Sequence, residues 1–529
     1  MTDQRQQILE RGSYFPGDWV RPRFNPGTWM AMVDVMEIFT GHRSITRDGR
    51  YEMFDGPVGV QLRVEEADKS EPFLHREKEW EQEGHMGPSN FWYADGLMHM
   101  FYDVGNSSCY AVSDDGYNWE RPVVGETEFN GSTDNNILKE AIPGAILDDP
   151  SALPAERYKA LSAKGFWLDR DTGEEVPHDE ADPCWRAEHY EGEAYSGRKV
   201  VLKGALIGHV SPDRYRWTEI EEPLGNYSVN GGMALNYDAD NGDYFAYIQP
   251  QGCAAVEPKA LGTSMPETEV VRRAVGLTRT KDFRHWPAAK LLVHPDAQDP
   301  LDISFYGACY FPFPGRHELH GMFLPVFHGV TDDVDMQIAI SRDGVVWTRP
   351  ERRPIARLDP SGSGEDGQIH VWRQGLVELP DGHWAVPYQG NSILHTVEEE
   401  YQARYFPNQM PMQHRWARWR PHRLCGVEAD SEGRFTIPTV FRLEDELRLN
   451  YRCAPGGWIQ VELMSRVPTM LCPDANPLVG FSFDECDRLT GDEEDRVVTW
   501  KGNSEISRVG EMAAIRVRLF QAKLFAYRL

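Results

Sequence analysis

The chain has 529 residues, of which 40% are hydrophobic and 26% are charged. This length exceeds what one hydrophobic core usually serves, so a repeat architecture or several domains is expected. The formal net charge of -28, from 83 acidic against 55 basic residues, disfavours nucleic acid and anionic membrane surfaces as partners. No apolar run approaches the roughly 18 residues of a membrane span.

The N-terminal sequence and the cysteines bear on location and cofactors. The first residues lack the apolar stretch and small-residue cleavage site of a secretory signal, which predicts a cytoplasmic protein. The eight cysteines form no CxxC pair and are interpreted as small buried hydrophobes. Because HxH and HExxH spacings are absent, any metal site would have to be assembled from separate strands. No cofactor is predicted, and homo-oligomerisation stays open.

Residues 1–80 contain alternating apolar segments at 30–36 and 58–64 but no repeated hairpin. They are expected to form an N-terminal extension with some strands.

A repeated pattern follows: a hydroxyl residue, an Asp two positions later and a Trp six positions later. The Asp can cap its own turn through backbone N–H groups, and the Trp can fold back as a packing plug. Each copy follows an alternating apolar strand, so each is expected to close a β-hairpin. The copies are Ser113–Trp119, Ser211–Trp217, Thr280–Trp286 and Ser341–Trp347.

A fifth hairpin occurs at 375–386, and the strand expected to follow it, around 423–427, leads to a turn at 430–435 that lacks the Trp. Five four-stranded units predict a five-bladed β-propeller over residues 81–438. The second unit carries a polar insertion at 169–198, expected on a face as a lid or contact. Alternating strands without the repeat, at 457–463, 496–500 and 515–520, predict a β-sandwich over 439–529. The predicted fold class is therefore all-β.

From about residue 85 to the C-terminus, the chain resembles glycoside-hydrolase-like propeller proteins, which are related at fold level to the invertase and arabinanase (β-fructosidase) families. The resemblance rests on the repeat turns, on 129–137, on 154–160 and on the tail from 480 to 527. It implies a sugar-active propeller and a carbohydrate substrate. Those families carry acids at the innermost strand starts of their first three blades. Here 85–90 differs at the first blade, and the third blade start, from residue 226, offers no carboxylate.

Ionisable residues just before each innermost strand are expected to converge on one mouth of the propeller. For glycoside cleavage by paired carboxyl groups, Asp149, Asp302 and Asp366 are predicted to supply the acid, base and orienting roles. Other acids at the blade starts are Glu81, Glu83 and Glu365. The predicted substrate-binding residues are His85, Asn90, Asp148, Trp372, His370 and His395.

Each candidate has a structural alternative. Asp148 or Asp149 could cap a turn before Pro150, and Asp302 could solvate a strand entry. The histidines could be satisfied within the core, and the repeat Asp residues are expected to be scaffold. The arginines of 415–423 could face an anionic substrate, although an exposed strand face is the preferred interpretation.

Two other functions stay open. A catalytically silent sugar-binding propeller is favoured by the missing acid at the third blade. A lyase or transferase would instead use His and Tyr at the same mouth.

Overall fold

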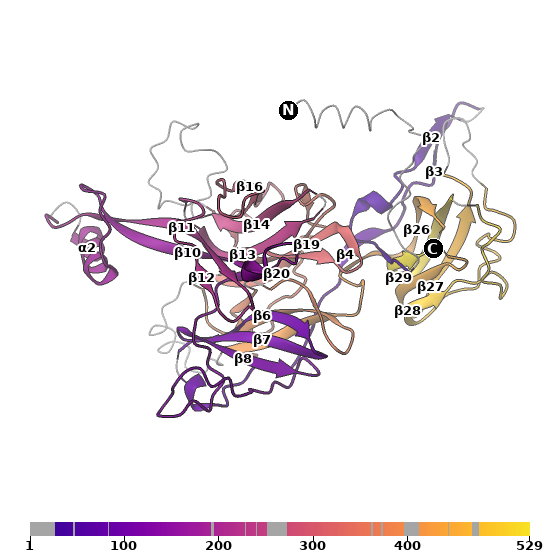
Figure 1. Ribbon diagram of the computed structural model, residues 1–529. Helices are drawn as coiled ribbons and strands as arrows, with labels where there is room; N and C mark the ends of the chain where they lie inside the picture. Colours follow the sequence, from indigo (N-terminus) through magenta and orange to yellow (C-terminus); the bar gives the residue numbers. More distant parts are fainter. Residues whose placement is uncertain are drawn as a thin grey trace. The chain divides into compact units, whose positions relative to one another are not determined.

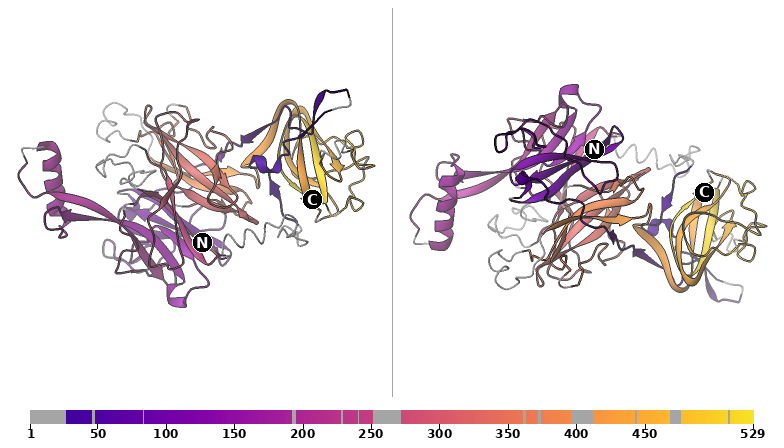
Figure 2. Two further views of the ribbon diagram at one scale, coloured as in Figure 1. Left: turned by 90° about the horizontal axis from the view of Figure 1, so that it is seen from above. Right: turned by 90° about the horizontal axis from the view of Figure 1, so that it is seen from below.

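The computed structural model divides into two units, each discontinuous in sequence (Figures 1 and 2). One comprises Glu66–Phe313 and His317–Trp419, and is called here the propeller unit. The other, the terminal unit, comprises Met1–Glu65, Pro314–Arg316 and Arg420–Leu529. The residues described are 27–45, 48–82, 84–191, 195–227, 229–239, 241–250, 272–360, 363–371, 374–395, 412–442, 444–467, 476–510 and 512–529.

The propeller unit consists of antiparallel sheets, three of which are formed by consecutive strands. The first sheet contains β6 (Met86–Ala94), β7 (Leu97–Val104) and β8 (Ser107–Ser113). The second contains β9 (Ala145–Asp148), β10 (Tyr158–Asp169), β11 (Val200–Ser211) and β12 (Thr218–Glu219). The third contains β13 (Val229–Asp238), β14 (Asp243–Pro250), β15 (Val275–Thr280) and β16 (Lys290–Val293).

A ten-stranded sheet completes the propeller unit. Its two parts are joined by a parallel pairing of β20 with β22, at Val334 and Gln368. One part contains β17 (Ile303–Phe305), β18 (Cys309–Phe313), β19 (Arg316–His328), β20 (Asp333–Ser341) and β21 (Trp347–Thr348). The other contains β22 (Gln368–His370), β23 (Val377–Glu378), β24 (Trp384–Asn391), β25 (Gln413–Trp419) and β5 (Asp68–Lys69).

The innermost segments of these sheets surround a cavity of about 180 Å³. Asn90 of β6, Ala145 of β9, Asn236 of β13, Tyr310 of β18 and Gln374 all line it. One cavity shared by the inner strands of successive sheets is the arrangement of a β-propeller around its axis. The predicted all-β propeller is thus confirmed, while the number of five blades stays a prediction.

The repeat turns follow β8, β11, β15 and β20, the third strand of each unit. In the first turn, Asp115 Oδ1 accepts hydrogen bonds from the backbone N–H groups of Tyr117 and Asn118, both at 2.7 Å. The Trp119 indole N–H donates to the Gly116 carbonyl at 3.2 Å. The same indole-to-carbonyl bond, three residues back, recurs at Trp217, Trp286 and Trp347. These side chains therefore close the hairpins.

The polar insertion of the second unit forms an arm, visible at the left of Figure 1. β10 and β11 pair along twelve residues each, but β9 covers only Tyr158–Leu161 of β10. The remaining ribbon carries helix α2 (His178–Glu191), which is held by a small core that includes Ala181, Val176 and Val200. Two short 3-10 helices, η2 (Glu79–Glu81) and η3 (Pro154–Glu156), precede β6 and β10.

The terminal unit is built on one antiparallel sheet in the order β28-β27-β29-β26-β4, with β1 beside β29. The register of β26 shifts between Ala429 and Glu432, and that of β27 shifts between Cys453 and Trp458. Such irregularities bend strands, and the curved sheet encloses its own core. The strands are β1 (Met30–Ala31), β2 (His42–Ile45), β3 (Tyr51–Phe54), β4 (Gln61–Val64), β26 (Cys425–Phe441), β27 (Arg448–Met464), β28 (Asp492–Val497) and β29 (Met512–Arg528), with a 3-10 helix η1 (Val35–Glu37).

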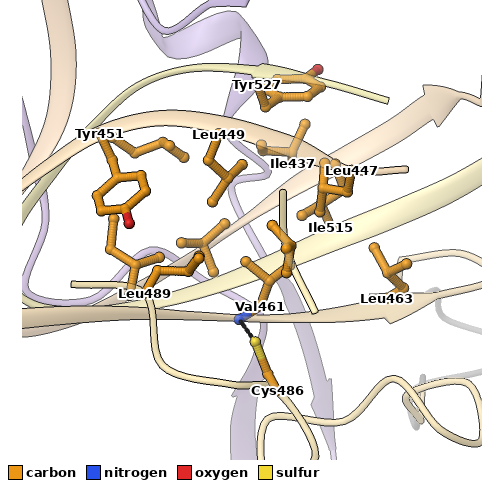
Figure 3. Packing of buried hydrophobic residues seen from close by; sticks show 14 of the residues in the cluster. Ile437, Leu447, Leu449, Tyr451, Val461, Leu463, Cys486, Leu489, Ile515 and Tyr527 are labelled. Atoms are coloured by element: carbon orange, nitrogen blue, oxygen red, sulfur yellow. Dashed lines mark hydrogen bonds between the residues drawn. The ribbon is translucent and has the colours of Figure 1, made fainter. Parts of the chain in front are cut away.

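Figure 3 shows this core, in which Leu449, Val461 and Ile515 are fully buried. Fully burying an aliphatic side chain of this size contributes about 1.5–3 kcal/mol. The Val461 N–H donates to Cys486 Sγ at 3.2 Å, which ties the 478–500 segment to β27. The packing agrees with the sandwich predicted for this end of the chain.

The strand expected to end the propeller belongs instead to the terminal unit. β26 pairs with β29 and β4, so the interpretation of 423–427 as the last strand of the fifth hairpin unit needs correction. Its place beside β25 is taken by β5, through the pairs Ala417 with Lys69 and Arg418 with Asp68. The expected extension 1–80 is thus divided between both units. The last segment of the propeller unit ends at Trp419, before the boundary expected at 438.

Candidate functional site

The mouth is defined here as the end of the propeller unit at which β6, β13, β17 and β22 begin. The parallel pairing of β20 with β22 shows that β17 and β22 begin at the same end, because β19 is antiparallel to both β17 and β20. β6 begins there too, since His414, at the start of β25, hydrogen-bonds the Met86 carbonyl at 2.5 Å. The repeat turns lie at the opposite end, because the third strand of a unit runs parallel to its first.

An aromatic and cationic cluster lies near the mouth, around Tyr306, which directly follows the three-residue strand β17. Tyr306 packs edge-to-face against the imidazoles of His395 and His370, with ring centroids 4.6 Å and 6.3 Å away. The guanidinium carbon of Arg273 lies 4.1 Å from the centre of the Tyr306 ring, within the range of a cation–π contact. These four residues are called the mouth cluster. Tyr306, Arg273 and His395 lie in three different strand connections, and His370 is the last residue of β22.

The surroundings of the mouth cluster shift the pKa values of its titratable side chains. Burial lowers the pKa of His370 to about 3, with the neighbouring His395 and Arg273 adding to the effect. Burial and then Arg273 also lower the pKa of His395, against the opposing charge of Asp332. The pKa of Tyr306 is raised, mainly by burial. At neutral pH both imidazoles are therefore uncharged and the phenol keeps its proton.

A second group of titratable side chains lies at the mouth end of the β17–β21 part. His328 Nε2 and Asp335 Oδ2 are 3.1 Å apart, and Asp335 is 9% exposed. The hydrogen bond to Asp335 raises the pKa of His328, whereas burial raises that of Asp335. The two side chains titrate as one coupled pair, and this pair stays protonated to a higher pH than an isolated imidazole does.

Asp302 stands beside this pair, one residue before β17. Its neighbour Ile303 pairs with His328, and His328 pairs with Asp333 of β20. Asp302 Oδ2 accepts a hydrogen bond from the Val330 N–H at 3.0 Å. The negative charge of Asp302 contributes to the raised pKa of His328. A half-buried carboxylate and a proton-holding pair therefore share one end of the same three strands.

The predicted binding residues His85 and His370 line a second cavity of about 30 Å³, together with His414. Gln374 lines both this cavity and the axial one. A Cβ built on Gly87 would lie 3.1 Å from ring atoms of both His85 and His414, so glycine allows the two imidazoles to approach each other. This cavity is about the size that a single water molecule requires.

The structure brings several predicted residues to the mouth. Asp302 and Asp366 lie just before β17 and β22, and His395 belongs to the mouth cluster. Asn90 lies farther along, in the middle of β6, and lines the axial cavity. Trp372 lies outside the described residues, as does Glu83.

Asp148 and Asp149 lie at the other end, because β9 begins at Ala145 and ends at Asp148. Asp149 is fully engaged: it accepts hydrogen bonds from Tyr244 at 2.5 Å and Ser151 at 2.5 Å, and lies 3.1 Å from Lys159 Nζ. Asp148 pairs with Arg157 and Arg214. A catalytic role for Asp149 and a binding role for Asp148 find no geometric support at the mouth.

The remaining predicted acids form internal ion pairs. Glu365 is 1% exposed and binds Lys69 at 3.0 Å, Arg415 at 2.9 Å and the Tyr388 hydroxyl at 2.9 Å. Glu81 is held by Tyr102 and Arg121, both at 2.7 Å. The other arginines of the basic stretch pair with acids: Arg418 with Asp68, and both Arg420 and Arg423 with Asp492.

Sequence reasoning missed Tyr306, Arg273, His328 and Asp335. Tyr306 lies four residues after the predicted site residue Asp302, so its closeness to that strand start is visible in the sequence. His328 and Asp335 lie at the end of one middle strand and the start of the next. They therefore do not fall just before an innermost strand, where the site residues were expected.

Within the described part of the chain, no group of three or more His, Cys, Asp or Glu side chains is arranged to hold a metal ion. No helix among the described residues is long and apolar enough to cross a membrane.

No family profile matches the chain, and no curated protein sequence matches it. Solved structures do resemble it. An endo-arabinase from Bacteroides thetaiotaomicron aligns with 66% of this chain and 97% of its own, at 9% identity and a TM-score of 0.34. A GH32 β-fructofuranosidase from Bombyx mori aligns with 89% of this chain and 93% of its own, at 11% identity and a TM-score of 0.33.

An N-acetylgalactosamine deacetylase from F. plautii aligns with 72% of this chain and 94% of its own, at 12% identity and a TM-score of 0.34. The solved structures that resemble this chain thus include glycoside hydrolases.

Proposed function

We propose that the protein is a carbohydrate-active enzyme that cleaves a glycosidic bond by hydrolysis at the mouth of the propeller unit. The observation that carries the proposal is the position of Asp302 beside His328, which in turn hydrogen-bonds Asp335. Asp302 is half-buried, whereas burial raises the pKa of Asp335. Glycoside cleavage requires two such groups in different environments.

The roles follow from these environments. The His328–Asp335 pair holds a proton and would donate it to the leaving glycosidic oxygen. Asp302 would act on the anomeric carbon, or on the water molecule that attacks it. Asp366, just before the neighbouring β22, keeps the orienting role that the sequence suggested. The axial cavity, lined by Asn90, Asn236 and Tyr310, offers polar and aromatic surfaces suited to a sugar ring.

The test is turnover of a panel of chromogenic glycosides and natural oligosaccharides by the purified full chain. Asp302→Asn and Asp335→Asn are expected to lose most activity. Asp148→Asn is the matched control, because it removes a carboxylate at the opposite end of the unit, where exposed ion pairs contribute little stability. If the wild-type protein cleaves no member of the panel, or if Asp148→Asn is as inactive as Asp302→Asn, the proposal fails.

The mouth cluster favours a second candidate, cleavage by β-elimination. This reaction needs a base to remove a proton next to a sugar carboxylate, an acid for the leaving oxygen and a cation for the carboxylate. The uncharged His395, the protonated Tyr306 and Arg273 are of these three types. Products distinguish the two routes, since elimination leaves an ultraviolet-absorbing double bond and hydrolysis leaves a new reducing end alone.

A further inference from the structure

Gln249 lies near the mouth end of β14 and is 1% exposed. Among the described residues, neither its side-chain nitrogen nor its side-chain oxygen has a hydrogen-bond partner. An amide removed from water without partners is unfavourable, and folded proteins contain few. The Gln249 nitrogen can thus still donate hydrogen bonds, and its side-chain oxygen can still accept them.

The strand pairing places this amide on the face of the third sheet that packs against the β17–β21 part. Phe245 and Tyr247 alternate with Gln249 along β14 and belong to one core cluster with Phe305 and Val326. On the opposing sheet, Val326 pairs directly with Asp335, so Asp335 shares that face. Asp335 Oδ1 also has no hydrogen-bond partner within the described part of the chain. Two unsatisfied groups therefore stand on the two faces of one sheet interface, at its mouth end.

At the mouth end of this interface, the His328 side chain is 24% exposed and that of Asp335 12%. Solvent therefore reaches the pair at the histidine. A neutral sugar suits this pair of groups, because each hydroxyl both donates and accepts. One hydroxyl can donate to a carboxyl or amide oxygen while another accepts from the amide nitrogen.

We propose that Gln249 is a substrate-binding residue that takes hydroxyl groups of an uncharged sugar ring beside the His328–Asp335 pair. This inference rests on the proposed hydrolytic function and names the residue that fixes the sugar relative to the proton donor. The buried amide is the recognition element, and it is satisfied only when sugar is bound.

The test combines stability with sugar binding in the full chain. Gln249→Leu keeps the side-chain volume and removes the unsatisfied amide nitrogen and oxygen. It should therefore raise the temperature midpoint of unfolding. The same change should weaken sugar binding about tenfold. Gln368→Leu is the matched control: Gln368 is 8% exposed and its amide donates to the Ile393 carbonyl at 2.7 Å, so its loss should lower the midpoint.

Binding is measured by ligand-observed NMR with four free sugars as probes: arabinose, fructose, galactose and galacturonate. The expected result is that a neutral sugar binds the wild type, and that Gln249→Leu is more stable but binds it less well. Unchanged binding by Gln249→Leu, a lowered midpoint, or no binding of any probe to the wild type would each overturn the inference. Gln249-dependent binding without cleavage of any glycoside would leave it standing while the proposed function falls.

Discussion

The two ends of the propeller unit use their polar side chains in opposite ways. At the end away from the mouth, Asp149 and the turn carboxylates such as Asp115 are surrounded by hydrogen-bond donors. At the mouth, Asp335 and Gln249 are buried with unused hydrogen-bonding atoms, and His395 is held uncharged. The end at which we propose the site thus differs from the opposite end in its unused capacity for hydrogen bonds and protons, and not in its number of carboxylates.

The largest expected effect is catalytic and concerns Asp302. Asp302→Asn should lower kcat/KM by about 100- to 10,000-fold, because an amide cannot serve as base or nucleophile. Since the Val330 N–H can bond an amide oxygen equally well, the midpoint of urea unfolding should stay close to that of the wild type. Steady-state kinetics on a cleaved glycoside and urea titration measure the two quantities. Equal losses of activity and stability would contradict this division of roles.

Asp149 should show the reverse pattern. Asp149→Ala leaves the buried Lys159 ammonium without its carboxylate, at a cost of about 3–5 kcal/mol in unfolding free energy. The folded fraction of this variant should retain wild-type kcat, because the change lies at the end away from the mouth. Urea unfolding followed by tryptophan fluorescence gives the free energy. A fully stable Asp149→Ala variant without activity would restore Asp149 to the site.

These two carboxylates also show what could be predicted from sequence. The repeat turns fixed the hairpins, and with them the propeller and the structural role of the turn acids. The strand starts at Asp302 and Asp366 followed from that periodicity. Asp149 was misplaced because the short β9 begins four residues before it, a register that no local signal marks. The His328–Asp335 hydrogen bond and the pairing of β5 with β25 each join separate stretches of the chain. Neither could therefore be predicted from a local sequence pattern.

The pH dependence should separate the two candidate reactions. If the His328–Asp335 pair donates the proton, activity should fall as pH rises through a value above the ordinary histidine pKa of about 6.5, because the hydrogen bond to Asp335 raises the pKa of His328. His328→Gln should displace or abolish this alkaline limb of the kcat/KM profile. A profile with no alkaline limb in the wild type would argue against the pair as proton donor.

If the mouth cluster performs elimination, an acid limb should be seen instead. His395 must be uncharged to act as base, so activity should fall as pH drops through its lowered pKa. Arg273→Gln removes one cause of that lowering, and the limb should move to higher pH. The shift is expected to be smaller than the loss in Asp302→Asn. Identical profiles for wild type and Arg273→Gln would remove His395 as the titrating group.

The smallest effect is expected at a repeat turn. Asp115→Ala removes two backbone hydrogen bonds and should cost about 1 kcal/mol, as the loss of a capping side chain does. The backbone N–H groups hold the pKa of Asp115 down at about 2. Its stabilisation is therefore complete above about pH 4 and lost as pH falls through that lowered value. Acid unfolding of the two proteins should converge near that pH, with activity at neutral pH unchanged.

The pairing of β5 with β25 has a consequence for how the chain is made. Asp68 emerges from the ribosome long before Arg418, the residue with which it pairs. Likewise, β4 is synthesised long before β26, its partner strand. Neither unit can finish folding until synthesis has passed the 413–441 stretch, so both closures occur late. Deletion of residues 61–69 is therefore expected to leave both sheets with exposed edges. Open edges recruit other strands, which makes aggregation, rather than two smaller soluble domains, the expected outcome of cutting there.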